Sequence, residues 1–136
     1  MKYYFAQFSP AEKGMYSIWF PDVPEAITCG ENLEDAMFMA QDCLRMALEE
    51  YAKEGRSLPE PSSLEEVRAK VAEHEKDMDV EKFGEDLYPL IAAPDMDTTP
   101  VRISVSMPRN VLAALDRKAE RAGMTRSGYI ASIAMA

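Results

Sequence analysis

Residues 14–24 read Gly14-Met15-Tyr16-Ser17-Ile18-Trp19-Phe20-Pro21-Asp22-Val23-Pro24, and this stretch decides how the first part of the chain folds. Its side chains alternate, so that one face carries Tyr16, Ile18 and Phe20 and the other carries Ser17 and Trp19. A period of two residues is typical of a half-buried strand, and the prolines that follow it mark a turn. The stretch therefore predicts a strand over residues 15–20 that ends in a turn.

Further strands are predicted on both sides of this stretch. Residues 2–8 are rich in aromatic side chains and are separated from residues 15–20 by a polar loop, which predicts a hairpin. Residues 25–29 can form a short third strand. Residues 87–92 indicate a fourth strand, and Pro89 within it favours a position at the edge of a sheet because proline has no N–H to donate.

The apolar period changes to three and four residues after residue 32, which indicates a helix. Asn32 is a good N-terminal cap, and Gly55 is a natural residue to follow the C-terminus. A second helix is predicted from the capping residues Ser62 or Ser63 to about Glu75. The apolar positions of the first helix are Leu33, Ala36, Met37, Ala40, Leu44, Ala47, Leu48 and Tyr51, and those of the second are Leu64, Val67 and Val71.

Charge is divided unevenly along the chain. Residues 1–97 contain 9 Lys and Arg against 22 Asp and Glu, a net charge of −13, whereas residues 98–136 contain 6 against 2, a net charge of +4. An acidic body with a basic tail is typical of a protein whose tail binds nucleic acid. Residues 94–100 have the composition of a linker, so we predict a domain boundary between residues 97 and 98.

The basic tail has the order strand, helix, helix. Val101, Ile103 and Val105 alternate with polar residues, Pro108 is well placed to begin a helix, and Ala122-Gly123 ends that helix. Thr125 or Ser127 can cap a final helix. Its expected core residues are Tyr129, Ile130 and Ile133.

Two parts of the chain resemble known protein families. The tail, with Gly123-Met124-Thr125-Arg126-Ser127 before its last helix, resembles the ribbon-helix-helix repressors. The first part resembles the HicB antitoxins of toxin–antitoxin modules, although Glu25-Ala26 stands where that family often has Gly-Cys. The matching residues are 14–24, Thr28-Cys29-Gly30, Leu33-Glu34-Asp35-Ala36, Tyr51, Gly55 and Leu58-Pro59-Glu60-Pro61-Ser62.

The resemblance implies an α+β protein with two domains. Residues 1–97 would form a truncated ribonuclease-H-like domain, an antiparallel sheet packed by helices, and residues 98–136 a small ribbon-helix-helix domain. It further implies an antitoxin that binds and neutralises a small ribonuclease toxin of the HicA type and, as a dimer, represses its own operon by binding operator DNA. Assembly of dimers into tetramers stays open. The alternative is a stand-alone transcriptional regulator whose first domain senses a ligand or a protein.

The tail offers chemistry suited to DNA. A two-stranded ribbon built from two protomers would bury its apolar face and present the other face to the major groove, where arginine can form a fork onto guanine. The final helix would place its N-terminus near phosphates. A pure dimerisation module is the alternative. The candidate DNA-binding residues are Arg102, Ser104 and Ser106 on the ribbon and Thr125, Arg126 and Ser127 at the helix N-terminus.

Catalysis is not expected of the first domain, because residues 2–8 contain no acid that could hold a catalytic metal. The lone His74 is interpreted as part of a solvated helix face. Two cysteines without clustered histidines cannot form a structural zinc site, so no metal or cofactor is expected. The negative charge of this domain suits a basic partner or simply solubility. Without a signal sequence or a membrane-spanning run, the chain is expected in the cytoplasm.

Overall fold

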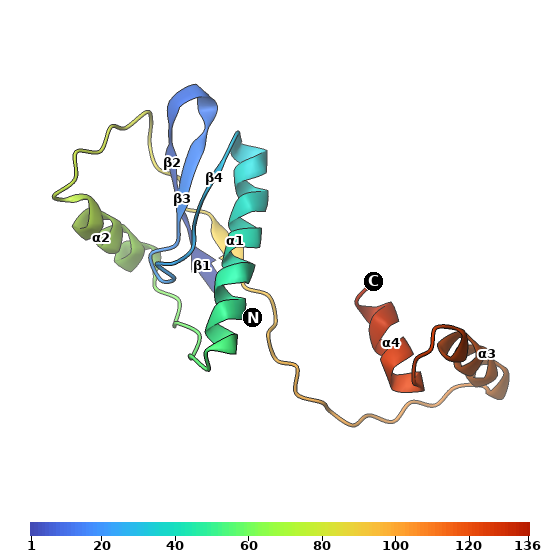
Figure 1. The fold of residues 1–136 in the computed structure, drawn as a ribbon. Helices are drawn as coiled ribbons and strands as arrows, with labels where there is room; N and C mark the ends of the chain where they lie inside the picture. The colour runs from blue at the N-terminus through green and yellow to red at the C-terminus, as the bar shows by residue number, and fades with distance from the viewer. The chain divides into compact units, whose positions relative to one another are not determined.

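The structure, a computed structural model, describes all of residues 1–136 and divides them into two compact units, Met1–Thr98 and Thr99–Ala136 (Figure 1). The first unit contains five strands, a short 3-10 helix (Glu12–Gly14) and two α-helices. The second contains two helices. The elements are β1 (Tyr3–Phe5), β2 (Gln7–Pro10), β3 (Tyr16–Trp19), β4 (Ile27–Gly30), α1 (Leu33–Lys53), α2 (Leu64–Glu75), β5 (Leu90–Ala92), α3 (Arg109–Arg121) and α4 (Arg126–Ala134).

The sheet of the first unit is antiparallel throughout. Strand β3 lies in the middle of a three-stranded sheet with the order β2-β3-β4, and β1 pairs with β5. The predicted strands over residues 15–20 and 25–29 are confirmed with slightly shifted bounds. The fold class is a mixture of helices and antiparallel sheets, as predicted.

The prediction of one strand over residues 2–8 was wrong in one respect, because the strand is divided at Ala6 into β1 and β2. The cause lies on the neighbouring strand. Ala6 donates its N–H to the carbonyl of Pro89 (3.0 Å), but Pro89 has no N–H to return. Pairing resumes on either side, where Phe8 and Leu87 exchange two hydrogen bonds. The same proline shortens the predicted strand over residues 87–92 to β5, which lies at a sheet edge as expected.

Helix α1 covers one face of the sheet and forms the core with it. Ala36, Ala40, Leu44 and Leu48 are fully buried, as the helical period predicted. Asn32 caps the helix by accepting a hydrogen bond from the N–H of Asp35 (2.8 Å), and Gly55 follows its end with a positive φ of 69°. The sheet residues in this core are Tyr4, Ala6, Phe8, Ile18, Phe20 and Ile91.

Helix α2 lies against the opposite face. Ser63 and Glu66 form the expected capping box, and Val67 and Val71 are buried. Leu64, which was expected to point inward, is exposed because it occupies the first helical position beyond the cap. His74 is exposed as expected, but it also stacks on Trp19, with the ring centroids 4.5 Å apart.

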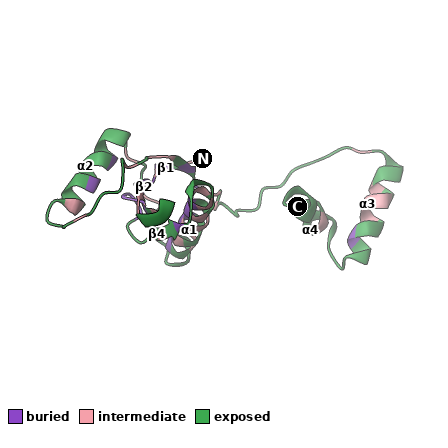
Figure 2. Cartoon of the chain, turned by 90° about the horizontal axis from the view of Figure 1, so that it is seen from above, coloured by how far each residue is buried: buried purple, intermediate pink, exposed green.

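The second unit has almost no core of its own. Ala119 is its only buried residue, and Figure 2 shows α3 with one buried and several intermediate positions among exposed ones. The predicted strand over residues 101–106 is extended chain without a hydrogen-bonded partner in this single protomer. Ile130 and Ile133, expected in the core, are 41% and 55% exposed for the same reason, since no second copy covers them. Tyr129 is half-buried.

Candidate functional site

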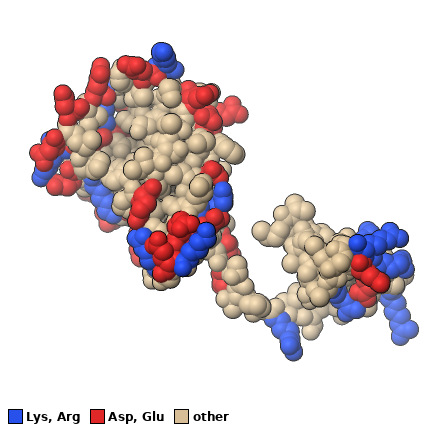
Figure 3. All heavy atoms as spheres, in the orientation of Figure 1, with Lys and Arg blue, Asp and Glu red and all other residues tan.

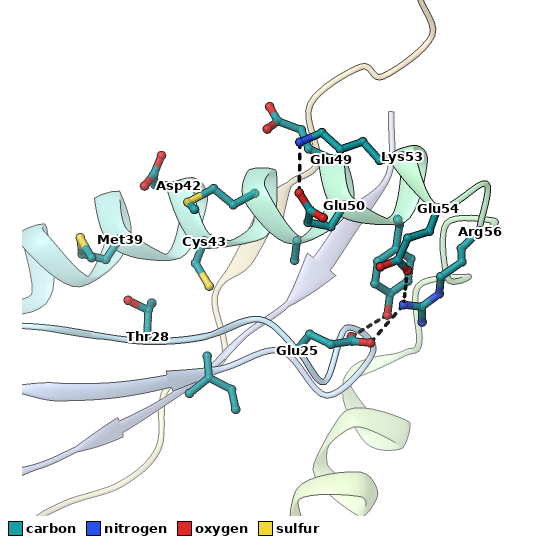
Figure 4. Close-up of a pocket in the computed structure, with 14 residues that line it drawn as sticks. Glu25, Thr28, Met39, Asp42, Cys43, Glu49, Glu50, Lys53, Glu54 and Arg56 are labelled. Atoms are coloured by element: carbon teal, nitrogen blue, oxygen red, sulfur yellow. Dashed lines mark hydrogen bonds and ion pairs between the residues drawn. The ribbon is translucent and has the colours of Figure 1, made fainter.

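A groove of about 680 Å³ lies between β4 and α1 on the first unit (Figure 4). The strand contributes Ile27 and Thr28, and the helix contributes a row of side chains beside them. Strand and helix are held close at one end, because a Cβ on Gly30 would lie only 2.5 Å from the Cα of Ala36. The apolar residues of the helix that line the groove are Met39, Cys43, Met46 and Ala47.

One end of the groove is closed by a cluster of three side chains. Tyr51 donates its hydroxyl hydrogen bond to Glu25 (2.7 Å), and the Arg56 guanidinium lies 3.7 Å from the centre of the Tyr51 ring. Arg56 also contacts the Glu25 carboxylate at 3.3 Å. The hydrogen bond from Tyr51 holds the pKa of Glu25 below its ordinary value, so this carboxylate is charged at neutral pH.

Acidic side chains dominate the rim of the groove. Five acids and only two cations line it, and the cations are already shared among the acids. Lys53 contacts Glu50 at 3.1 Å, and Arg56 forms ion pairs with both Glu25 and Glu54. Arg45, outside the groove, also pairs with Asp42 (2.6 Å) and Glu49 (2.9 Å). The five acids still outnumber these three cations, so the groove keeps a negative potential that favours a basic ligand. The acids are Glu25, Asp42, Glu49, Glu50 and Glu54.

The structure places the candidate DNA-binding residues on two separate segments of the second unit. Arg102, Ser104 and Ser106 are exposed on the extended segment before α3. Within one protomer, nothing holds this segment in a ribbon. The three residues alternate with Val101, Ile103 and Val105, whose exposed fractions are 79%, 74% and 66%.

The other three candidates lie at the N-terminus of α4. Thr125 caps this helix by accepting a hydrogen bond from the N–H of Gly128 (3.1 Å). The side chain of Arg126 forms a bidentate ion pair with Asp116 of α3, at 2.9 and 3.0 Å, which lowers the pKa of the Asp116 carboxyl. Arg126 therefore holds the two helices together, and Ser127 remains exposed in the first turn.

No period in the sequence indicated the groove. Met37 and Met39 pack against the core, and Met39 also lines the groove together with Met46, which is 56% exposed. The acids of the groove are spread over 30 residues of sequence, and only the packing of β4 against α1 brings them together. Glu25, noted as a departure from the HicB pattern, was the one available signal.

The structure contains no cluster of side chains suited to bind a metal ion. No three His, Cys, Asp or Glu side chains converge in a way that could hold a metal ion. Cys29 is exposed and Cys43 half-buried, and both thiols are free. None of the helices combines the length and the apolar character that crossing a membrane requires.

Known proteins resemble this chain over both units. A family model described as the HicB-like antitoxin of bacterial toxin–antitoxin systems matches residues 4–134, which defines the class of protein as a bacterial antitoxin. Because the match covers nearly the whole length, the chain belongs to the HicB-like antitoxin family.

Individual relatives agree with this family. Antitoxin HicB 2 of Photorhabdus laumondii is 40% identical over 68 residues, which are 50% of this chain and 48% of that protein. Antitoxin HicB of Escherichia coli K12 is 41% identical over 56 residues, 41% of either chain. The chain therefore spans less than half the length of the curated relatives that it matches.

Solved structures extend the likeness in fold. The crystal structure of the Burkholderia pseudomallei antitoxin HicB has a TM-score of 0.55 and 25% identity, covering 99% of this chain and 95% of that one. A chain of a toxin–antitoxin complex from Streptococcus pneumoniae has a TM-score of 0.57 and 17% identity, covering 98% and 97%.

Proposed function

We propose that this chain is an antitoxin that binds and neutralises a small ribonuclease toxin of the HicA type, and that it represses its own operon by binding operator DNA as a dimer. The observation that carries the proposal is the family match over residues 4–134, because it includes both units. Because a ribonuclease and an operator would both be met in the cytoplasm, the proposal includes a cytoplasmic location. No catalytic step is assigned to the chain itself.

The charge of the first unit supports a toxin partner. Ribonucleases must bind RNA and are usually basic, so a partner of net charge −13 over residues 1–97 attracts them and raises the rate of association. Figure 3 shows Asp and Glu side chains around the margin and at the lower end of the first unit. This charge supports a toxin-binding surface on the first unit.

The exposed apolar residues of the second unit support a dimer. A unit of this size with one buried residue cannot fold alone, because too little apolar surface is removed from water. Pairing of residues 101–106 with the same segment of a second copy would bury the alternating Val101, Ile103 and Val105. The ribbon-helix-helix arrangement that results would present Arg102, Ser104 and Ser106 to the major groove.

Two measurements test this function. The protein encoded by the neighbouring gene should arrest the growth of cells when it is expressed alone. Co-expression of this chain should restore their growth. Binding to the promoter of the chain should weaken with salt, by about 0.9 log units per log unit of salt for each phosphate contacted. A stand-alone regulator would bind its promoter but give no protection. Protection without promoter binding would contradict the repressor half.

A further inference from the structure

Strand β4 has one backbone edge without a partner. The N–H of Phe20 donates a hydrogen bond to the carbonyl of Ala26 (3.2 Å), so Phe20 and Ala26 are a hydrogen-bonded pair between β3 and β4. Along an antiparallel ladder every second pair is hydrogen-bonded. The next such pair is Ile18 and Thr28, and Thr28 therefore bonds to β3. The N–H and C=O groups of Ile27 and Cys29 therefore point away from the sheet, and no other segment of the chain bonds to them.

This edge lacks the features that usually protect an edge strand. Such strands commonly carry lysine, proline or a bulge, which prevent pairing with another chain. Strand β4 has the sequence Ile-Thr-Cys-Gly and contains none of these. Its Ile27 side chain is 66% exposed, and the groove with its apolar floor begins directly beside it. The edge is therefore open to an added strand.

The charge around the edge selects the chemistry of the partner. Glu25 precedes β4, and Asp42 and Glu50 on α1 line the same groove (Figure 4). A strand that is added here places its alternate side chains in the groove and the others outside. Apolar side chains would suit the floor of the groove, and Lys or Arg side chains would suit its rim.

We propose that a basic, extended segment of the toxin adds a strand to the free edge of β4 and lays its apolar side chains into the groove between β4 and α1. This assignment rests on the proposed function and adds the surface and the mode of binding. Strand addition uses main-chain hydrogen bonds for affinity and the neighbouring pocket for specificity. The outward groups of Ile27 and Cys29 provide up to two donors and two acceptors for it.

A second copy of the first unit is a poorer occupant of this edge. Two β4 strands related by a two-fold axis would bring the acidic rims of both grooves together, and like charges at close range repel. The basic tail of the same chain carries the opposite charge and an alternating segment at residues 101–106. These two occupants give their own signatures in the test.

Amide hydrogen exchange of the full chain tests the assignment directly. The probe is the small basic protein encoded by the neighbouring gene, with its catalytic histidine replaced so that it can be produced. The amides of Ile27 and Cys29 should exchange rapidly in the free chain, and at least about tenfold more slowly in the saturated complex. Thr28 should be protected in both states because it bonds to β3.

A pair of variants at one position tests the role of the backbone. Cys29→Pro removes an outward N–H and leaves the ladder to β3 intact, since edge positions tolerate proline. Cys29→Val retains this N–H and changes only the side chain. Affinity for the probe should fall about tenfold in Cys29→Pro relative to Cys29→Val, because one hydrogen bond is lost and the ring blocks the added strand.

A second pair tests the charge of the groove. Asp42→Lys reverses a charge on the rim, and Asp79→Lys makes the same change at an exposed position outside the groove. At low salt, association with the probe should be about tenfold slower for Asp42→Lys and changed less than threefold for Asp79→Lys. Equal effects of both variants would mean that only the overall charge matters, which contradicts the proposed groove.

The outcomes separate this assignment from the proposed function. If the unchanged chain does not bind the probe, the proposed function fails and the assignment fails with it. If it binds while Ile27 and Cys29 still exchange rapidly, only the assignment is wrong. Protection in the free chain that disappears on removal of residues 99–136 would identify the tail as the occupant. Protection that rises with the concentration of the chain alone would identify a second copy.

Discussion

Asp22 is the only buried charged side chain of the protein, and three hydrogen bonds hold it in place. It accepts from the backbone N–H of Ser62 (2.7 Å), from the Ser62 hydroxyl (2.7 Å) and from the Lys70 ammonium group (2.6 Å). From the sequence, only a turn was expected after residue 20. The carboxylate in fact ties the turn before β4 to the start of α2, forty residues away along the chain. Burial raises the pKa of this carboxyl, but the hydrogen bonds from Lys70 and Ser62 outweigh burial and lower it below 3.8.

We predict that Asp22→Asn lowers the free energy of unfolding of the first unit by about 2–3 kcal/mol at neutral pH. Urea denaturation followed by the fluorescence of Trp19, the only tryptophan, measures this change. Asp79→Asn is the control, since Asp79 is exposed and a surface substitution should change the free energy by less than about 0.5 kcal/mol.

The effect of Asp22 should depend on pH. The folded carboxyl has the lower pKa, so its contribution is complete above the ordinary value of 3.8 and is lost as pH falls through the folded pKa. The difference between the unchanged chain and Asp22→Asn should therefore shrink below pH 3.8. A difference that stays constant down to pH 2.5 would mean that the charge of Asp22 does not stabilise the fold.

Arg102 is the one side chain on the proposed open face of the ribbon that can make two hydrogen bonds to a single base. Arg102→Ala should cost about 1–3 kcal/mol in operator affinity and relax the preference for one base in each half-site. Fluorescence anisotropy with the operator and its single-base variants measures both effects. Dimerisation and toxin binding should be unchanged. If the dimer dissociates instead, the ribbon faces the opposite way.

At the scale of the element, the segment over residues 101–106 shows that a strand needs a partner, whereas a helix can form within a single chain. Its alternation of apolar and polar residues is that of a strand, but a strand needs a partner for its backbone, and this protomer provides none. The helices behave differently, because their hydrogen bonds are internal and their caps are local. Thr125 and Pro108 therefore begin α4 and α3 where the sequence placed them.

Ile103→Ser should break the dimer, because it places a polar side chain in the core that two copies of the segment would form. Light scattering should show a monomer at concentrations where the unchanged chain is a dimer, and specific DNA binding should be lost with it. Ser104→Ala is the matched control and should leave the dimer intact. A monomer from Ser104→Ala and a dimer from Ile103→Ser would show that the register is shifted by one residue.

The elements of the first unit were predictable because their signals are local. The period of residues 15–20, the Asn32 cap and the Ser63 capping box each lie within a few residues of the structure that they determine. The division at Ala6 and the groove depend on residues that are distant in sequence, namely Pro89 for the first and the packing of α1 against β4 for the second. No period or spacing in one segment carries that information.

At the scale of the whole molecule, the two units should be separable. A chain that ends at Thr98 keeps the whole core around Phe8, Ile18 and Leu44. It should unfold at the same urea concentration as the first unit of the full chain, bind the toxin with the same affinity and lose binding to the promoter. Calorimetric titration and promoter binding measure the last two. A folded first unit that fails to bind toxin would place the toxin surface in the second unit.

On the proposed function, the single buried residue of the second unit would link repression of the operon to the abundance of the protein. A fold that exists only when two copies meet depends on concentration, whereas a cluster of fourteen buried side chains makes the first unit indifferent to dilution. As a growing cell diluted the protein, the concentration of such dimers would fall with the square of the monomer concentration, and each remaining monomer could still bind one toxin. Transcription would thus resume while the ribonuclease is still restrained, and fresh antitoxin would be made before the old supply runs out.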